Sequence, residues 1–188
     1  MTNATATPTR TPVPTGRWAV DPSHSSIEFQ VKHLGIASVR GHFANFGGTL
    51  EIGEDLASAK AYGTVDAGSV DTNDEARDAH LRSPDFFDVE RYPEIRFESR
   101  EITPKGDETF EITGDLTMHG ESHELKLEAE ITGTERDPYG NDRVGLEITG
   151  QLNRGDYGMT FNQVLGSGNA LVSDKVKLQL DISAIKQY

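Results

Sequence analysis

Six histidines are the side chains that first suggest a metal site. His24 and His33 lie too far apart along one predicted strand to bind the same ion, and they fall on opposite faces of that strand. His80 lies on a predicted helix, and His119 and His123 flank a turn. No H-x-H or H-E-x-x-H sequence is present, and the chain has no cysteine. We therefore predict no metal site and expect hydrogen-bonded structural histidines.

Covalent catalysis has little support in the residue pattern. The chain lacks cysteine, which excludes a thiol nucleophile and disulfides. No G-x-S-x-G sequence marks a serine nucleophile, and the glycines around Ser167 lack the strand and helix of a phosphate-binding loop. We predict no catalytic residues and no cofactor. A hydrolase or isomerase acting on a lipophilic substrate stays open as the alternative, and it would need a titratable pair inside the fold.

A polar run on a predicted helix, formed by Arg77, Asp78 and His80, has two interpretations. These side chains could contact the polar head of a ligand, or they could anchor the helix to the rest of the fold. The anchoring role is favoured because helix ends need polar partners for their free backbone groups.

The overall charge limits the choice of partners. The chain has 18 basic and 31 acidic residues and a formal net charge of -13, which disfavours nucleic acid and anionic membranes. No apolar run approaches the roughly 18 residues that span a bilayer, so we predict no stable membrane insertion. Residues 1–16 contain six threonines and three prolines without a signal-peptide pattern. We predict a disordered tail over 1–16, one domain over 17–188 and a cytoplasmic location.

From residue 17 onward the main signal is a period of two. Ile27, Phe29, Val31 and His33 share one face of a predicted strand, and polar residues occupy the other face. Such alternation is typical of half-buried antiparallel strands. We predict eight of them, at 25–33, 38–52, 58–68, 94–103, 108–118, 122–136, 142–153 and 175–186. The apolar phase shifts between Phe43 and Phe46, which indicates a bulge or bend beside two glycines.

Two segments interrupt the strands. Residues 72–88 predict two short helices, because Thr72 and Glu75 have capping-box spacing and Ser83 precedes a proline. Residues 154–174 form a long connection of the kind that serves as a lid or binding loop. Eight strands with one apolar face can fold into a sandwich or close into a barrel. Of these we predict the barrel, an all-β, eight-stranded antiparallel fold with a short helical cap.

An eight-stranded barrel can be filled by side chains or can hold one small ligand. Small residues such as Gly63, Gly114, Ala129 and Gly150 fall in the inward phase. They could complement larger neighbours in a tapering core, or they could leave an apolar tunnel. Periodicity alone leaves both interpretations open.

Several segments together resemble the YceI-like family of bacterial lipocalin-like, polyisoprenoid-binding proteins. They are, in order, DPSHS (21–25), IEFQVKH (27–33), VRGHF (39–43), SVDT (69–72), RDAHLRS (77–83), DFFD (85–88), YPEIRF (92–97), GDLT (114–117) and NRGDYG (153–158). The resemblance implies a lipocalin-like barrel with an apolar tunnel for isoprenoid quinones, polyprenyl chains or other long-chain lipids, and no enzymatic activity. Many members carry an export signal, and the Thr/Pro-rich start of this chain departs from that pattern.

These considerations predict a protein that carries or stores a lipophilic small molecule. The predicted ligand contacts are Phe29, Val31, His33, Phe43, Phe46, Phe86, Phe87, Phe97, Leu116, Leu127, Ala129 and Leu146. Burial of the ligand's hydrocarbon tail is expected to dominate affinity, since each buried methylene contributes roughly 0.8 kcal/mol and a neutral hydrogen bond to the ligand's head group about 1 kcal/mol. The sequence also leaves a homodimer open.

Overall fold

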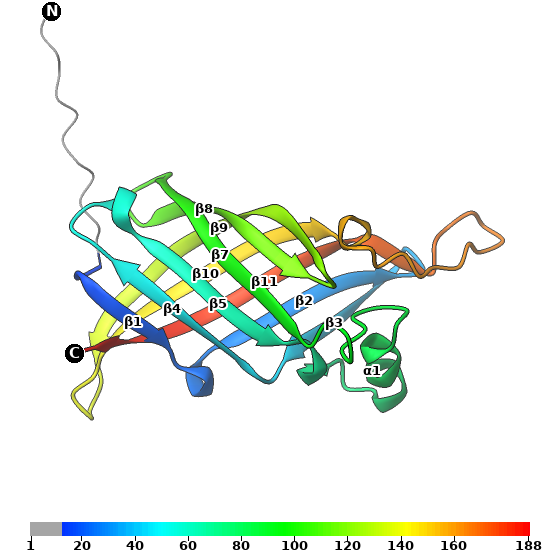
Figure 1. Cartoon of the computed structure of the whole chain (residues 1–188), viewed down its shortest axis with the longest axis horizontal. Helices are drawn as coiled ribbons and strands as arrows, with labels where there is room; N and C mark the ends of the chain where they lie inside the picture. Colours follow the sequence, from blue (N-terminus) through cyan, green and yellow to red (C-terminus); the bar gives the residue numbers. More distant parts are fainter. Residues whose placement is uncertain (1–12) are drawn as a thin grey trace, which may run out of the picture.

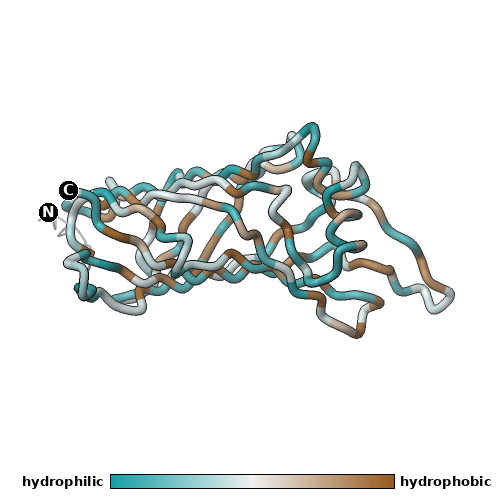
Figure 2. Tube along the Cα trace, turned by 90° about the horizontal axis from the view of Figure 1, so that it is seen from below, coloured by the Kyte–Doolittle hydropathy of each residue, from teal (hydrophilic) through white to brown (hydrophobic). Residues whose placement is uncertain are grey.

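The predicted alternation appears as a ladder of antiparallel strands in the computed structural model, which describes residues 13–188 (Figure 1). Figure 2 shows apolar and polar residues alternating along these strands. The strands are β1 (Gly16–Val20), β2 (Ser26–His33), β3 (Ala37–Phe43), β4 (Phe46–Ile52), β5 (Lys60–Asp66), β6 (Val70–Asp71), β7 (Glu94–Pro104), β8 (Thr109–Met118), β9 (Glu121–Arg136), β10 (Asp142–Asn153) and β11 (Val172–Gln187).

Hydrogen bonds close these strands into an eight-stranded barrel. β1 and β2 both pair with β11, β4 pairs with β1, and β3 pairs with β2. β5 and β6 continue the same pattern beside β4 and β3. The pairs β1 with β2, β3 with β4, and β5 with β6 therefore each act as one bent strand. Together with β7 to β11 they make eight strands around the ring. The predicted fold class is confirmed.

The bend that the sequence indicated lies between Phe43 and Phe46. There the backbone N–H groups of Ala44 and Asn45 donate to the carbonyl and hydroxyl oxygens of Ser69, at 3.1 and 3.0 Å, instead of to a neighbouring strand. The strand predicted at 38–52 is therefore divided into β3 and β4. The sequence prediction missed β1, which is separated from β2 by a 3₁₀ turn over Pro22–His24.

The capping segment contains one helix, α1 (Glu75–Arg82), and the prediction of two helices is wrong. Asp74 is the N-cap, and its carboxylate accepts from the N–H of Arg77 at 2.9 Å. Residues 83–88 form turns because the carbonyl of Ser83 accepts from both Phe86 and Asp88, each at 3.0 Å. Asp88 adopts a positive φ of 49°, which ends helical geometry.

The two ends of the barrel differ in what covers them (Figure 1). The start of β1, the end of β11 and the turn at 137–141 lie at one end. The hairpin at 33–37, α1 and the loop at 158–171 lie at the other. We call these the closed end and the mouth. No helix among residues 13–188 has the length and apolar character needed to cross a bilayer.

Residues 13–16, which fall within the predicted tail, lie against the barrel. Val13 is buried, and the carbonyl of Pro14 accepts from the Trp18 indole N–H at 3.1 Å. The indole and the Val13 side chain pack in the core, which fixes these residues against the barrel. The remainder of the predicted disordered tail, residues 1–12, lies outside the described part of the chain.

Candidate functional site

The main site is an apolar cavity of about 440 Å³ inside the barrel. This volume falls within the range of roughly 300–1,000 Å³ that is typical of small-molecule pockets. Strands from around the barrel supply its wall, together with α1 and the loop at 158–171. Its lining contains neither Asp nor Glu. The interior is therefore hollow over part of its length, as the tunnel interpretation required.

The structure places ten of the twelve predicted ligand contacts on the cavity wall. These are Phe29, Val31, His33, Phe43, Phe46, Phe86, Phe87, Phe97, Leu116 and Leu127. Ala129 and Leu146 pack in the core outside the cavity: Ala129 lies between Phe110 and Ile148 on the adjacent strands, and Leu146 packs against buried core residues. Ala129 points into the barrel as expected, but it lies at a height along the barrel axis where the interior is packed and not hollow. The role of these residues in ligand binding stays a prediction.

A packed layer ends the cavity toward the closed end. On β8 to β11, the last residues on its wall are Ile112, Leu127, Ile148 and Ile182. Beyond them the interior is filled by Trp18, Phe110, Ala129, Ile131, Val144 and Ala184, each at most 8 % exposed. Sequence reasoning missed Trp18, although its being the only tryptophan was an available signal.

The small inward residues do not all leave empty space. A Cβ atom on Gly114 would lie 2.6 Å from the Phe97 ring, and one on Gly150 would lie 2.6 Å from a methyl group of Leu127. These glycines make room for large neighbours, as the tapering-core interpretation proposed. The two interpretations therefore apply together, because glycines admit the bulky residues that form the cavity wall.

Aromatic rings cover the mouth. The ring of His80 packs edge-on against Phe86 and Phe161, with centroids 5.0 and 4.9 Å apart. These rings come from α1, the turn after it and the long loop, so they connect three segments over the cavity. The Nε2 atom of His80 lies 2.8 Å from the carboxylate of Asp85. Phe161 was not among the predicted contacts, because no periodic pattern marks a loop residue.

Arg154 is the charged group most deeply buried at the mouth, 4 % exposed. Its guanidinium donates to the carbonyls of Met159 at 2.8 Å and Ser173 at 2.9 Å, and it lies 5.9 Å from the Phe86 ring centroid. Burial lowers the pKa of Arg154, and the exposed carboxylate of Asp174 at 3.5 Å opposes that shift. Arg154 thus holds both ends of the long loop against the barrel.

The interpretation of Arg77 and Asp78 as anchors agrees with the contacts of Thr72. The buried carboxylate of Asp78 accepts from the Thr72 N–H at 2.8 Å and from the Thr72 hydroxyl. Arg77 donates to the hydroxyl and carbonyl oxygens of the same threonine, each at 2.7 Å. Arg77 and His80 also line the cavity, so anchoring and ligand contact are compatible for them.

A family model described as YceI-like domain matches residues 18–184. The chain belongs to the YceI-like family. A UPF0312 protein of Staphylococcus aureus is 37% identical over 162 residues, which cover 85% of this chain and 91% of that protein. The crystal structure of the Campylobacter jejuni YceI protein is similar, with a TM-score of 0.72 and 28% identity over 84% of this chain and 90% of that one.

A more distant structure shares the fold of this YceI-like chain. It is titled a polyisoprenoid binding domain from Saccharophagus degradans, with a TM-score of 0.69 and 13% identity. The match covers 90% of this chain and 98% of that chain. At this identity the likeness concerns the barrel architecture alone.

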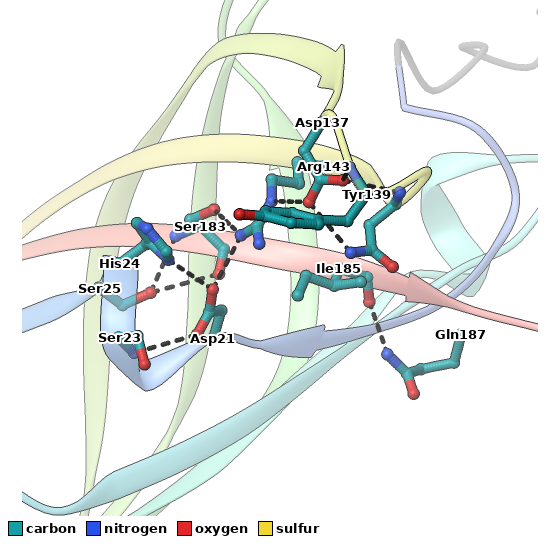
Figure 3. A network of polar contacts seen from close by, with 11 residues as sticks. Asp21, Ser23, His24, Ser25, Asp137, Tyr139, Arg143, Ser183, Ile185 and Gln187 are labelled. Atoms are coloured by element: carbon teal, nitrogen blue, oxygen red, sulfur yellow. Dashed lines mark hydrogen bonds and ion pairs between the residues drawn. The ribbon is translucent and has the colours of Figure 1, made fainter.

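A polar cluster fastens the closed end of the YceI-like barrel (Figure 3). The Arg143 guanidinium donates to Asp21 at 2.9 Å and to Asp137 at 2.8 Å, and His24 lies 2.7 Å from Asp21. Hydrogen bonds from Arg143 and then His24 lower the pKa of Asp21 to about 2. The backbone of Asn141 and then Arg143 lower the pKa of Asp137. This cluster lies outside the cavity wall and has a structural role.

The titratable groups near the cavity offer few catalytic arrangements. Among residues 13–188 no three His, Asp or Glu side chains gather as ligands for a metal ion. Burial raises the pKa of Tyr157 to about 12, so its phenol stays neutral at ordinary pH. The His80 ring pairs with Asp85, and within the described chain no hydroxyl group bonds to that ring.

Proposed function

We propose that this protein holds a long-chain lipophilic molecule, such as an isoprenoid quinone, a polyprenyl chain or another long-chain lipid, and carries or stores it. The observation that carries the proposal is the apolar cavity of about 440 Å³ enclosed by the barrel. Empty apolar space inside a close-packed protein forfeits contacts that an apolar ligand would restore. The similar fold of a domain titled polyisoprenoid binding supports the same ligand class.

The hydrocarbon tail of the ligand supplies most of the affinity in this proposal. A five-carbon isoprene unit buried in the cavity contributes roughly 3–4 kcal/mol, at about 0.8 kcal/mol per carbon. Two such units exceed the contribution of any single hydrogen bond to the head group, which is about 1 kcal/mol. Lys32, His33 and Arg77 line the mouth, so a head group with acceptor oxygens fits there best.

The same cavity disfavours chemistry on the bound molecule. General acid–base catalysis needs a titratable group within reach of the reacting atoms. The wall is mostly aliphatic and aromatic and contains no Asp or Glu, and its basic and imidazole side chains are Lys32, His33, Arg77, His80 and Arg154. A binding function therefore explains the wall better than a hydrolase or isomerase does.

The Val31→Trp variant tests whether ligand enters the cavity. Val31 is half-buried on the cavity wall, so the indole fills space that the ligand would occupy. We expect affinity for geranylgeraniol to fall at least about tenfold, with little change in the melting temperature of delipidated protein. Fluorescence titration and thermal unfolding measure the two quantities, and mass spectrometry of an organic extract identifies any native ligand.

Two further tryptophan variants serve as controls. Thr149→Trp adds the same ring on the exposed outer face of β10 and is expected to change neither quantity. Ala129→Trp adds it to the packed layer, where overpacking costs about 1–3 kcal/mol of stability. The proposal fails if wild-type protein yields no lipid in the extract and also takes up no geranylgeraniol.

A further inference from the structure

Two exposed aliphatic side chains occur at the mouth of the barrel. Ile36 in the hairpin at 33–37 is 78 % exposed, and Val164 in the loop at 158–171 is 77 % exposed. Among residues 13–188 the other exposed large hydrophobic residues are Tyr139 and Tyr188, both at the closed end. Among the described residues, the large aliphatic side chains that are exposed to water therefore both lie at the mouth.

The two segments form one surface. The N–H of Leu34 donates to the carbonyl of Leu171 at 3.0 Å, and His33 pairs with Val172. Gly35 lies beside the Asn169 side chain. Figure 1 shows the hairpin next to the base of the loop, and Figure 2 shows apolar stretches along the loop as it projects beyond the barrel.

This surface differs in charge from the rest of the molecule. Although 31 of the 188 residues are Asp or Glu, none occurs in 29–50 or in 157–173. Apart from residues 1–20, these are the longest stretches of the chain without an acidic residue. Lys32 and Arg40 add positive charge beside the hairpin. An anionic head-group surface, which repels most of this acidic protein, would thus meet no carboxylate on these two segments.

The cavity reaches the same surface. His33 and Arg77 are exposed and also line the cavity, and Phe161 and Leu171 of the loop contribute to its wall. A ligand leaving between these segments would emerge where Ile36 and Val164 project. An apolar ligand pays a large free-energy cost for crossing water, which direct contact between the mouth and a bilayer would remove.

We propose that the mouth surface, formed by residues 33–37 and 158–171, docks reversibly on a phospholipid bilayer. Ile36 and Val164 enter the interface between head groups and acyl chains, and the cavity then opens toward the lipid. Such peripheral contact requires no spanning segment, and its strength scales with the apolar area that enters the interface. The docking step rests on the proposed lipid-binding function and adds the route by which ligand is exchanged.

The test is co-sedimentation of wild-type protein and the double variant Ile36→Ser, Val164→Ser with phosphatidylcholine vesicles. Both side chains are exposed and lie outside the cavity wall, so folding and geranylgeraniol affinity should be unchanged. We expect vesicle partitioning of the variant to fall roughly tenfold or more, together with the rate of geranylgeraniol transfer to vesicles. Tyr139→Ser removes an aromatic ring that is even more exposed, 89 %, at the closed end and should leave both quantities unchanged.

The outcomes separate docking from ligand binding. Wild-type protein that binds geranylgeraniol but does not sediment with vesicles overturns the docking proposal alone. Failure to bind geranylgeraniol, together with an organic extract of wild-type protein that contains no lipid, overturns the proposed function itself. A second copy of the chain could occupy this surface instead of a bilayer, and sedimentation velocity tests for it. If wild-type protein is a dimer that the double variant abolishes, and neither protein binds vesicles, the surface belongs to a dimer contact.

Discussion

Arg143 shows how a single residue can hold distant parts of the barrel together. Its guanidinium connects Asp21, which follows β1, to Asp137 in the turn between β9 and β10, and it also donates to Ser183 on β11 at 3.2 Å. Both carboxylates are largely shielded from solvent, with 14 % and 11 % of their side chains exposed. Their ionised forms are therefore stabilised in the folded state.

The Arg143→Met variant should change how stability responds to acid. The pKa of Asp21 is about 2 in the folded protein, below its ordinary value, and that of Asp137 is lowered as well. Their contribution to stability is thus present above about pH 4 and is lost as the pH falls toward 2. We expect the variant to be less stable at pH 7 and to lose less stability between pH 4 and 2. Urea unfolding midpoints across this range measure the effect.

Arg96→Met is the matched control for this acid response, because Arg96 forms an exposed ion pair with Glu94. Exposed ion pairs contribute little to stability, so its curve should parallel that of the wild type. Equal destabilisation of Arg143→Met at every pH would show that packing, and not carboxylate ionisation, explains the role of Arg143.

At the scale of elements, the strands could be predicted from sequence and the cap could not. Alternation is a local property, so it located every long strand, and polar turns such as 137–141 marked the hairpins. The cap depends on contacts between segments. Thr72 had the spacing of an N-cap, but Asp78 takes up its hydroxyl and N–H, and Asp74 caps α1 instead.

The Asp78→Ala variant should loosen α1 and the mouth. Removing the carboxylate leaves the buried Thr72 N–H without its acceptor, which costs about 1–3 kcal/mol. Amide hydrogen exchange should accelerate over residues 72–88 and stay slow in β9 and β10. Glu75→Ala, on the exposed side of the same helix, should have little effect. Unchanged exchange at the cap in Asp78→Ala would rule out the anchoring role of this carboxylate.

For the whole molecule, the division of the barrel into a packed half and a hollow half is the main result that sequence could not supply. Leu127 lines the cavity and Ala129, two residues later on the same face, is packed. Strand phase gives the face of a residue but not its level along the barrel axis. Whether the interior is filled at a given level depends on large residues such as Trp18, which lies on a strand that periodicity missed.

Two truncated chains, beginning at residue 13 and at residue 17, test this division into a packed and a hollow half. A chain beginning at residue 17 lacks Val13 and the Pro14 carbonyl, whereas one beginning at residue 13 keeps both contacts with the packed half. Because Val13 is buried and Trp18 would lose its acceptor, we expect the shorter chain to be less stable by at least about 2 kcal/mol in urea unfolding. Its affinity for geranylgeraniol should be nearly unchanged, since the cavity wall begins beyond Trp18. Equal unfolding free energies would show that residues 13–16 do not support the closed end.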